Sequence, residues 1–402
     1  MIKAPQLKDG PPLSRFPTHA KLVLSSLVLS SMLTGCQVLN EPESSSLPAQ
    51  TDNTLQVIET KKPKKSVQPA VIDDIWVRIQ SGLAMDLNQS NNRIQTEVNW
   101  YTKHKNYFNQ ISSRAEPYLY FIVKEAETRK MPLELALMPI VESSFDPFAY
   151  SHAGASGLWQ FMPETGEHYN LEQNWWYDGR RDVIASTRAA LDYMVYLHSI
   201  FDDWELALAA FNAGPGRVLR AVKKNQQLGK STRFWALDLP QETTAYVPKL
   251  IALGKIVKNP AKFGVTLDFI DNKPYFSKVN TLGQLDLAKA SKLSGVDLKD
   301  LYRLNPGLNR WSTPPDGPHY LVVPVKHAES FHTHLVTLPP EERLSWERYV
   351  VKSGDNLGKI AREYNTSIDV ISDVNELDST IIHIDQGLLI PVSTKRSEAY
   401  IL

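Results

Sequence analysis

The sequence predicts an α+β multidomain protein in which an all-α domain precedes small βααβ modules. Its 402 residues are enough for two or three domains, and 42% of them are hydrophobic, as in ordinary soluble globular proteins. Apolar residues recur with helical spacing across residues 71–265. After about Phe263 the pattern changes to short strands that flank pairs of helices. We therefore expect two architectures in one chain.

Positive and negative charges balance. Lysine plus arginine and aspartate plus glutamate each number 44. Without a positive field over the whole protein there is no electrostatic basis for a nucleic-acid partner. The histidines show neither an HExxH motif nor another cluster with ligand spacing. We expect no metal and no cofactor, and the sequence identifies no protein partner.

Residues 1–35 have the layout of a secretory signal peptide. Four basic residues precede an apolar run over residues 22–33, which is too short to span a bilayer as a helix. The run ends in Leu-Thr-Gly-Cys at residues 33–36, which resembles the lipobox of bacterial lipoproteins. The resemblance implies cleavage before Cys36 and lipidation of its thiol. Cys36 is the only cysteine, so no intrachain disulfide can form.

The same resemblance implies a periplasmic protein anchored to the outer membrane. Gln37 stands where many lipoproteins of the inner membrane have aspartate. Residues 36–70 are rich in serine, proline, glutamine and lysine, a composition that predicts a flexible tether. Four lysines at residues 61–65 are either part of this solvated linker or contacts for wall carboxylates and anionic headgroups.

Residues 71–265 are predicted to form a compact helical domain. Ile94, Val98 and Tyr101 follow i, i+4, i+7 spacing, which places them on one face of a helix. Asp182 is a candidate N-cap for a helix that ends near Ser199. Most of the aromatic residues in this range are expected in the core.

Glu142 ends an apolar helical run and precedes a glycine-rich turn. An apolar setting and a helix C-terminus both raise the pKa of a carboxyl group, and cleavage of a glycosidic bond needs an acid that keeps its proton near neutral pH. Pro139 is expected to kink or tighten the helix just before Glu142. Ser143 is close enough in sequence to hydrogen-bond the carboxyl group. Taken alone, a glutamate at a helix end is usually a solvated surface residue.

Four motifs change that interpretation. Between residues 142 and 247 they occur in the order Glu142-Ser143, Gly157-Leu158-Trp159-Gln160-Phe161-Met162, Phe211-Asn212-Ala213-Gly214 and Glu242-Thr243-Thr244-Ala245-Tyr246-Val247. Together they resemble the signature of the lytic transglycosylases related to goose-type lysozyme. The resemblance implies a lysozyme-like catalytic fold over residues 71–265, peptidoglycan glycan strands as the substrate and Glu142 as the catalytic residue.

The resemblance also assigns roles to the remaining motif residues. Three are expected to support catalysis beside the glutamate: Ser143, Asn212 and Tyr246. Four are expected to bind substrate: Gln160, Phe161, Met162 and Phe211, where the family usually has tyrosine at the last position. The open alternatives are a C-terminal cap for Asn212, a structural role for Tyr246 and core packing for Met162.

The number of carboxylates separates the candidate reactions. Hydrolysis normally uses two, whereas the motifs provide only Glu142, and Asp146 before Pro147 is typical of a turn. The family's chemistry instead uses the C6 hydroxyl of N-acetylmuramic acid, which closes a 1,6-anhydro ring when the bond to N-acetylglucosamine breaks. A lysozyme-like muramidase and a non-catalytic peptidoglycan-binding scaffold remain as alternatives.

Residues 349–393 resemble a LysM module, with a strand, a Ser-Gly-Asp-Asn-Leu turn at residues 353–357, two short helices and a closing strand. The resemblance implies that N-acetylglucosamine chains bind near Gly354, Asp355, Asn356 and Ile382. Capping and turn formation are the alternative roles of these residues.

Residues 270–326 look like an earlier, degenerate copy of this module. Asn305 matches Asn375, and residues 323–325 match residues 390–392. The copy lacks the Ser-Gly-Asp turn, which leaves its sugar binding open, and a docking surface for the helical domain is an alternative role. Residues 327–348 are expected to be a linker or an extended arm.

Overall fold

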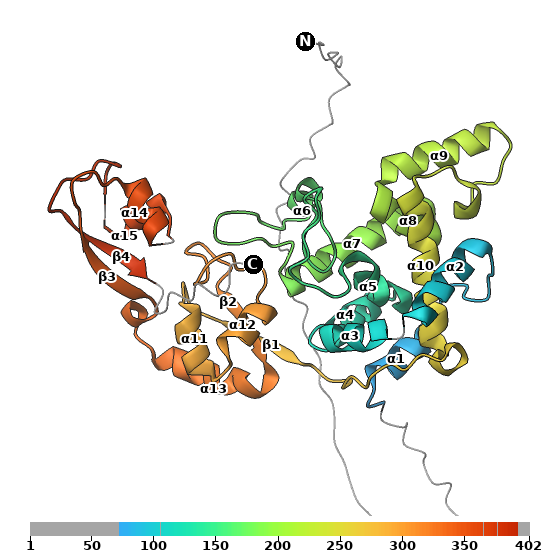
Figure 1. Ribbon diagram of the computed structural model, residues 1–402, viewed down its shortest axis with the longest axis horizontal. Helices are drawn as coiled ribbons and strands as arrows, with labels where there is room; N and C mark the ends of the chain where they lie inside the picture. Colours follow the sequence, from blue (N-terminus) through green and yellow to red (C-terminus); the bar gives the residue numbers. More distant parts are fainter. Residues whose placement is uncertain (1–71, 105, 365, 376, 393–402) are drawn as a thin grey trace, which may run out of the picture. The chain divides into compact units, whose positions relative to one another are not determined.

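The computed structural model describes residues 72–104, 106–364, 366–375 and 377–392 (Figure 1). The expected signal peptide, Cys36 and the tether lie outside these residues. Within the described ranges, no helix is both long enough and apolar enough to cross a membrane.

The first part of the chain is helical, as the periodicity predicts. Its elements are α1 (Ile75–Ser81), α2 (Asn92–Lys103), α3 (Asn106–Ala115), α4 (Leu119–Thr128), the 3₁₀ helix η1 (Leu133–Leu137), α5 (Met138–Ser143), α6 (Pro163–His168), α7 (Val183–Phe201), α8 (Trp204–Ala213), α9 (Pro215–Gln227), η2 (Phe234–Ala236), α10 (Gln241–Lys258) and η3 (Pro260–Phe263).

Side-chain caps fix where several of these helices begin. Asp182 accepts a hydrogen bond from the backbone N–H of Ala185 at the start of α7, as predicted. Asn91 and Asp203 cap α2 and α8 in the same way. Polar residues with short side chains therefore satisfy N–H groups that have no partner inside the helix.

Helix α10 lies in the centre of the helical domain. Leu250, Ile251 and Leu253 point to different sides of the helix and are fully buried. A helix that is apolar on nearly all sides belongs inside a core. This burial holds Thr243 and Tyr246, in the first two turns of α10, in fixed positions for the site described below.

The first module follows the expected βααβ order. Strand β1 (Phe276–Asn280) pairs antiparallel with β2 (Tyr320–Pro324), and helices α11 (Leu287–Ser294) and α12 (Leu298–Leu304) lie between them in sequence. The chain then continues as helix α13 (Val325–Thr337), whose Phe331 and Leu335 are fully buried in the core of this module. The expectation of a linker over residues 327–348 is therefore wrong for this helix.

The second module has the same order and its own core. Strand β3 (Ser345–Val350) pairs antiparallel with β4 (Gly387–Val392), with α14 (Leu357–Glu363) and α15 (Ile368–Val374) between them, and a short 3₁₀ helix, η4 (Pro340–Glu342), precedes β3. The core includes Leu357, Ile360, Leu388 and Ile390.

One hydrogen-bond pattern confirms that the two modules are copies. The side-chain amide of Asn305 donates to the carbonyl of Val322, and its oxygen accepts from the N–H of the same residue. Asn375 makes the same two bonds with Leu389. In each module an asparagine at the end of the second helix thus holds the closing strand.

The helical domain contacts the first module through backbone hydrogen bonds. The N–H of Asp178 donates to the carbonyl of Gly307 at 2.8 Å, and the N–H of Asn309 donates to the carbonyl of Trp176 at 2.8 Å. A side-chain bond adds to these contacts, because the hydroxyl of Tyr320 donates to the carboxylate of Asp182 at 2.7 Å. These contacts support the docking role considered for this module.

Candidate active site

The helix that carries Glu142 is short and tightly wound before the glutamate. The 3₁₀ helix η1 leads directly into α5, and Pro139 occupies the first turn of α5, where its missing N–H costs no helical hydrogen bond. Ser144 adopts a left-handed conformation with φ of 52° and ends the helix. Glu142 therefore stands in the last turn of α5, as predicted.

Tyr246 holds the carboxyl group of Glu142. Its hydroxyl donates to Glu142 Oε1 at 2.6 Å, and Tyr246 itself is 4% exposed. Burial raises the pKa of Glu142 to about 7, and the charge of Glu242 acts in the same direction. The hydrogen bond from Tyr246 and the charge of Lys249 lower the pKa but do not offset burial. Glu142 is thus a carboxyl group that retains its proton near neutral pH.

Ser143 does not contact the glutamate, so that expectation is wrong. Its hydroxyl lies within donating distance of two carbonyl oxygens, 3.0 Å from Leu158 and 3.2 Å from Pro139. The bond to Leu158 directs the side chain of Ser143 to the glycine-rich turn. Its role is to join α5 to that turn.

Gln160 stabilises the glycine-rich turn. Its side-chain nitrogen donates to the carbonyls of Gly157 at 2.9 Å and Ala149 at 3.2 Å, and its backbone has a φ of 49°. Gly157 has a φ of 82°, and a Cβ there would collide with the Arg180 carbonyl. The amide nitrogen of Gln160 is therefore engaged in the fold, and the amide oxygen is the part of this predicted substrate-binding residue left for a ligand.

Asn212 is connected to the glutamate through α10. Its side-chain oxygen accepts from the Thr243 hydroxyl at 2.8 Å, and Thr243 lies one turn before Tyr246. The residue is inside α8, whose C-cap is Gly214, so the alternative of a cap is wrong. Hydrogen bonds from Ser143, Tyr246 and Thr243 thus join all four motifs.

The apolar motif residues divide between core and surface. Phe161 is 3% exposed, and its ring lies 6.4 Å from that of the half-buried Phe211. Met162 is 42% exposed, which excludes core packing. Trp159 is fully buried and donates to the Thr187 hydroxyl. Met162 is consequently the apolar residue of the glycine-rich motif that a ligand can reach.

Two residues to which the sequence assigned no role act on this site. Thr243 positions Asn212, and the charge of Lys249 offsets part of the increase that burial causes in the pKa values of Glu142 and Glu97. Both lie three residues from Tyr246 on α10. This spacing puts them on the same face of the helix as Tyr246, so the sequence could have indicated their place in the site. Asp146 accepts from the N–H of Phe148, the turn role that the sequence indicated.

No group of three or more histidine, cysteine, aspartate or glutamate side chains is placed to hold a metal ion within the described part of the chain.

In the second module, the predicted sugar-binding residues stabilise the first turn. Asp355 accepts from the Tyr349 hydroxyl at 2.6 Å and the Lys352 N–H at 2.8 Å, and it pairs with Lys359 at 2.8 Å. Asn356 is the N-cap of α14, and Gly354 has a φ of 85°. Ile382 packs partly buried against the core of the module.

In the first module, the corresponding turn is covered by the chain itself. The N–H of Asp286, which caps α11 as Asn356 caps α14, donates to the carbonyl of Arg343 at 3.0 Å. The Lys289 side chain reaches the carbonyl of Glu342. The residues that lead to the second module thus cover the turn that precedes α11.

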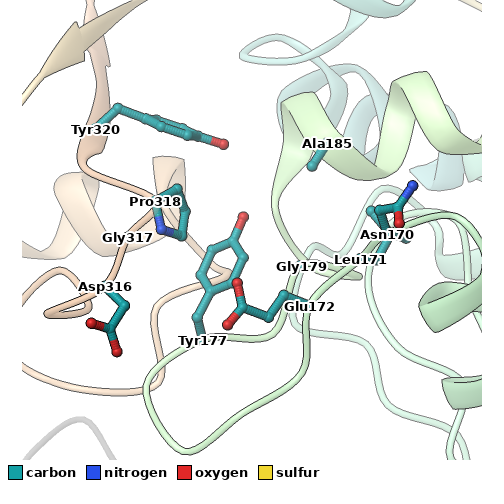
Figure 2. Close-up of a pocket in the computed structure, with 10 residues that line it drawn as sticks. All are labelled: Asn170, Leu171, Glu172, Tyr177, Gly179, Ala185, Asp316, Gly317, Pro318 and Tyr320. Atoms are coloured by element: carbon teal, nitrogen blue, oxygen red, sulfur yellow. The ribbon is translucent and has the colours of Figure 1, made fainter. Parts of the chain in front are cut away.

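A cavity of about 340 Å³ lies between the helical domain and the first module. Figure 2 shows residues from the helical domain, such as Glu172 and Tyr177, facing Asp316, Pro318 and Tyr320. The residues that line this cavity include none from the four motifs, so it is separate from the Glu142 site.

Comparison with known protein families agrees with this arrangement. Residues 119–234 match the transglycosylase SLT domain, residues 275–339 match the LysM-like domain of lytic transglycosylase MltD, and residues 349–391 match the LysM domain. The membrane-bound lytic murein transglycosylase D of Escherichia coli K12 is 37% identical over 379 residues, covering 90% of this chain and 84% of that protein. The chain belongs to the lytic murein transglycosylase D family.

Two further similarities cover less of the chain. A putative tributyltin chloride resistance protein of Alteromonas sp. M-1 is 49% identical over 162 residues, covering 39% of this chain and 78% of that protein. The crystal structure of an inactive mutant of the lytic transglycosylase Slt from Pseudomonas aeruginosa is 27% identical, with a TM-score of 0.28, and covers 36% of this chain and 24% of that chain.

Membership of the D family settles the class of reaction. The protein is a lytic transglycosylase, a lyase that acts on peptidoglycan, and it carries LysM peptidoglycan-binding domains. The alternative of a non-catalytic scaffold is thereby excluded.

Proposed function

We propose that Glu142 cuts the bond between N-acetylmuramic acid and N-acetylglucosamine, first as general acid and then as general base. The observation that carries this proposal is a carboxyl group with a pKa of about 7 whose Oε1 is held by Tyr246 at 2.6 Å. With Oε1 engaged, Oε2 carries the proton and donates it to the glycosidic oxygen. The N-acetylglucosamine end leaves with that proton as its hydroxyl hydrogen.

The glutamate is then a carboxylate, and it removes the proton of the C6 hydroxyl on the N-acetylmuramic acid. The C6 oxygen forms a bond to C1, which closes a 1,6-anhydro ring. Glu142 recovers its proton, and no water is consumed. The hydrogen bond from Tyr246 strengthens when the carboxyl group ionises, so the same contact orients the group in both steps.

Asn212 supplies an anchor for the substrate. Because Thr243 donates to its amide oxygen, the side-chain NH₂ group is directed away from Thr243 and remains able to donate. An N-acetyl carbonyl or a sugar hydroxyl is the acceptor that this group suits. The exposed Met162 provides an apolar contact for the sugar ring.

The second module is proposed to bind N-acetylglucosamine chains near its first turn and Ile382. A weak binding module joined to an enzyme raises the local concentration of substrate. Since Asp355 is held by three internal partners, the surface for sugar is the backbone of the turn at Gly354 rather than the Asp355 carboxylate.

The membrane attachment is proposed to be a lipid on Cys36. The family relative is described as membrane-bound, and residues 33–36 carry the lipobox pattern. The proposal places the enzyme in the periplasm on the outer membrane. A Cys36→Ser protein is expected in the soluble fraction, whereas recovery of this variant in the outer membrane would contradict the lipid anchor.

The reaction is tested by mass spectrometry of purified peptidoglycan after digestion by the protein that begins at residue 37. Products one water lighter than those of lysozyme are expected, and Glu142→Gln should yield none. Products with ordinary reducing ends would assign the site to a lysozyme-like muramidase. Anhydro products from the Glu142→Gln protein would refute the role of Glu142.

A further inference from the structure

Helix α9 concentrates positive charge in a chain whose net charge is zero. Residues 206–237 contain six lysine and arginine residues and no aspartate or glutamate. Four of the six lie on α9: Arg217, Arg220, Lys223 and Lys224. All four side chains are exposed. We call these four residues the basic face of α9.

The basic face is built at a cost in helix stability. Val218 and Asn225 are buried and hold one side of α9 against the domain, so the cations occupy the side exposed to solvent. Arg220 lies three residues from Arg217 and Lys223 and four from Lys224, spacings at which like charges repel. Arg217 stands in the first turn, where the helix dipole also disfavours a cation.

An acidic neighbour pairs with only one of these four cations. Lys224 pairs with Asp238 at 3.2 Å, and both side chains are exposed. Among the described residues, Arg217, Arg220 and Lys223 form no ion pair. A face of unpaired cations on a solvent-exposed helix is complementary to an anionic partner.

The position of α9 indicates which anionic partner the basic face binds. The helix begins three residues after Asn212, which is joined through Thr243 to the α10 face that carries Tyr246. Figure 1 shows α9 following α8 at the margin of the helical domain. With 13 residues, α9 is about 20 Å long. Its first residue follows closely on Asn212, so a ligand bound at Asn212 that carries anionic branches has α9 beside it.

This inference rests on the proposed function. We propose that the basic face of α9 binds carboxylates of the peptide branches on the glycan strand held at the Glu142 site. The lactyl group of each N-acetylmuramic acid carries such a branch, and the branch projects sideways from the sugar chain. The arginine guanidinium groups suit bidentate contact with a carboxylate, and the lysines add mobile charge farther out. The enzyme therefore prefers strands that still carry peptides.

The test compares kcat/KM on peptide-bearing strands with kcat/KM on strands from which an amidase has removed the peptides. The amidase leaves the lactyl carboxylate on the sugar, so the comparison isolates the carboxylates that lie out along the peptide. We expect a preference of about fivefold for peptide-bearing strands, the size that two exposed ion pairs provide. In Arg220→Gln/Lys223→Gln this ratio should fall toward one.

The matched control is Lys292→Gln/Lys299→Gln, which removes the same charge from exposed positions in the first module. The control should keep the wild-type ratio. Because the ion pairs are exposed, the wild-type preference should weaken as ionic strength rises. Glutamine removes like-charge repulsion without lowering helix propensity, so the α9 variant should melt at or above the wild-type temperature.

Three outcomes would overturn the proposal. They are equal rates of the wild type on both substrates, an unchanged ratio in the α9 variant, and an equal loss in the control variant. An unchanged ratio would assign the basic face to lipid headgroups if the α9 variant also bound phosphatidylglycerol vesicles more weakly than the wild type does, while both proteins bound phosphatidylcholine vesicles equally. The absence of anhydro products from the wild type would refute the proposed reaction instead, so the two failures are distinguishable.

Discussion

Two carboxylates in this molecule accept a tyrosine hydroxyl at the same distance, yet they differ in protonation. Tyr246 donates to Glu142 at 2.6 Å, and Tyr349 donates to Asp355 at 2.6 Å. Asp355 also receives a backbone N–H and the Lys359 ammonium, which together hold its pKa well below the usual range. Glu142 has the tyrosine alone, and burial raises its pKa to about 7.

The comparison teaches that the surroundings of a carboxyl group, rather than any single hydrogen bond, decide its role. An anion with three donors serves to fix a turn, because nothing in the physiological range removes its charge. A buried carboxyl group with one donor exchanges its proton near neutral pH, which is the property that acid and base catalysis needs. The predictions below test this contrast from its largest expected effect to its smallest.

Glu142→Gln should lower kcat by about 10³-fold or more, because the amide neither donates a proton to the glycosidic oxygen nor removes one from the C6 hydroxyl. The measurement is the rate of anhydro-product release from purified peptidoglycan. Glu329→Gln is the control, since Glu329 is an exposed carboxylate on α13. A Glu142→Gln protein with a tenth of the wild-type rate would mean that another group supplies the proton.

Tyr246→Phe should lower kcat/KM by about tenfold and also move its pH dependence. In the wild type, activity should fall as pH rises through about 7, because the acid form of Glu142 is lost. The Tyr246 hydrogen bond lowers this pKa by stabilising the anion, so its removal should shift the alkaline limb to higher pH. A limb that moves to lower pH, or stays in place, would contradict the assignment of that limb to Glu142.

Much of this site could be predicted from short patterns in the sequence. Asp182 as an N-cap, Glu142 at a helix end and Tyr246 beside it depend on short-range spacing or on residues within a motif, which the sequence displays directly. The partners of Ser143 and Gln160 depend on how the glycine-rich turn lies against α5 and the Ala149 carbonyl. That placement is a tertiary property, and no spacing in the sequence encodes it.

Helix α13 was missed for a different reason. Its residues were predicted to belong to a linker or extended arm, although Ala328, Phe331 and Leu335 have helical spacing. The buried stripe is narrow because one side of α13 covers α11 and β1 while the other faces solvent. A single narrow stripe in a polar segment is a weak signal until the surface that it covers is known.

Glu142 should make stability depend on pH in the direction opposite to Asp355. The folded protein binds the Glu142 proton more tightly than the unfolded chain does, so its contribution is full below about pH 4.5 and is lost as pH rises through about 7. At pH 8, Glu142→Gln should therefore have a larger free energy of unfolding than the wild type, by at most about 3 kcal/mol, and should unfold at a higher temperature. Near pH 4.5 the difference should vanish. A variant less stable than the wild type at pH 8 would refute the raised pKa.

Asp355→Asn should destabilise the second module above about pH 4, because the low pKa of Asp355 contributes stability that is present above its unfolded value of 3.8 and is lost in acid. The measurement is backbone hydrogen exchange across residues 349–363, which should become faster in the variant at pH 7 and approach the wild type, after correction for intrinsic exchange, in strong acid. Asp369→Asn in the same module is the control, because Asp369 is exposed.

The smallest effect is expected from Tyr349→Phe. The substitution removes one of three donors to Asp355. Tyr246→Phe instead removes the one side-chain hydrogen bond that Glu142 receives from the part of the chain that the structure describes. The ammonium of Lys359 and the N–H of Lys352 still hold the Asp355 anion, so the turn should keep its conformation and exchange only slightly faster than in the wild type. Exchange as fast in Tyr349→Phe as in Asp355→Asn would show that the tyrosine alone fixes the turn. The number of donors would then not explain why these two carboxylates differ, and the burial of Glu142 would have to account for the whole contrast.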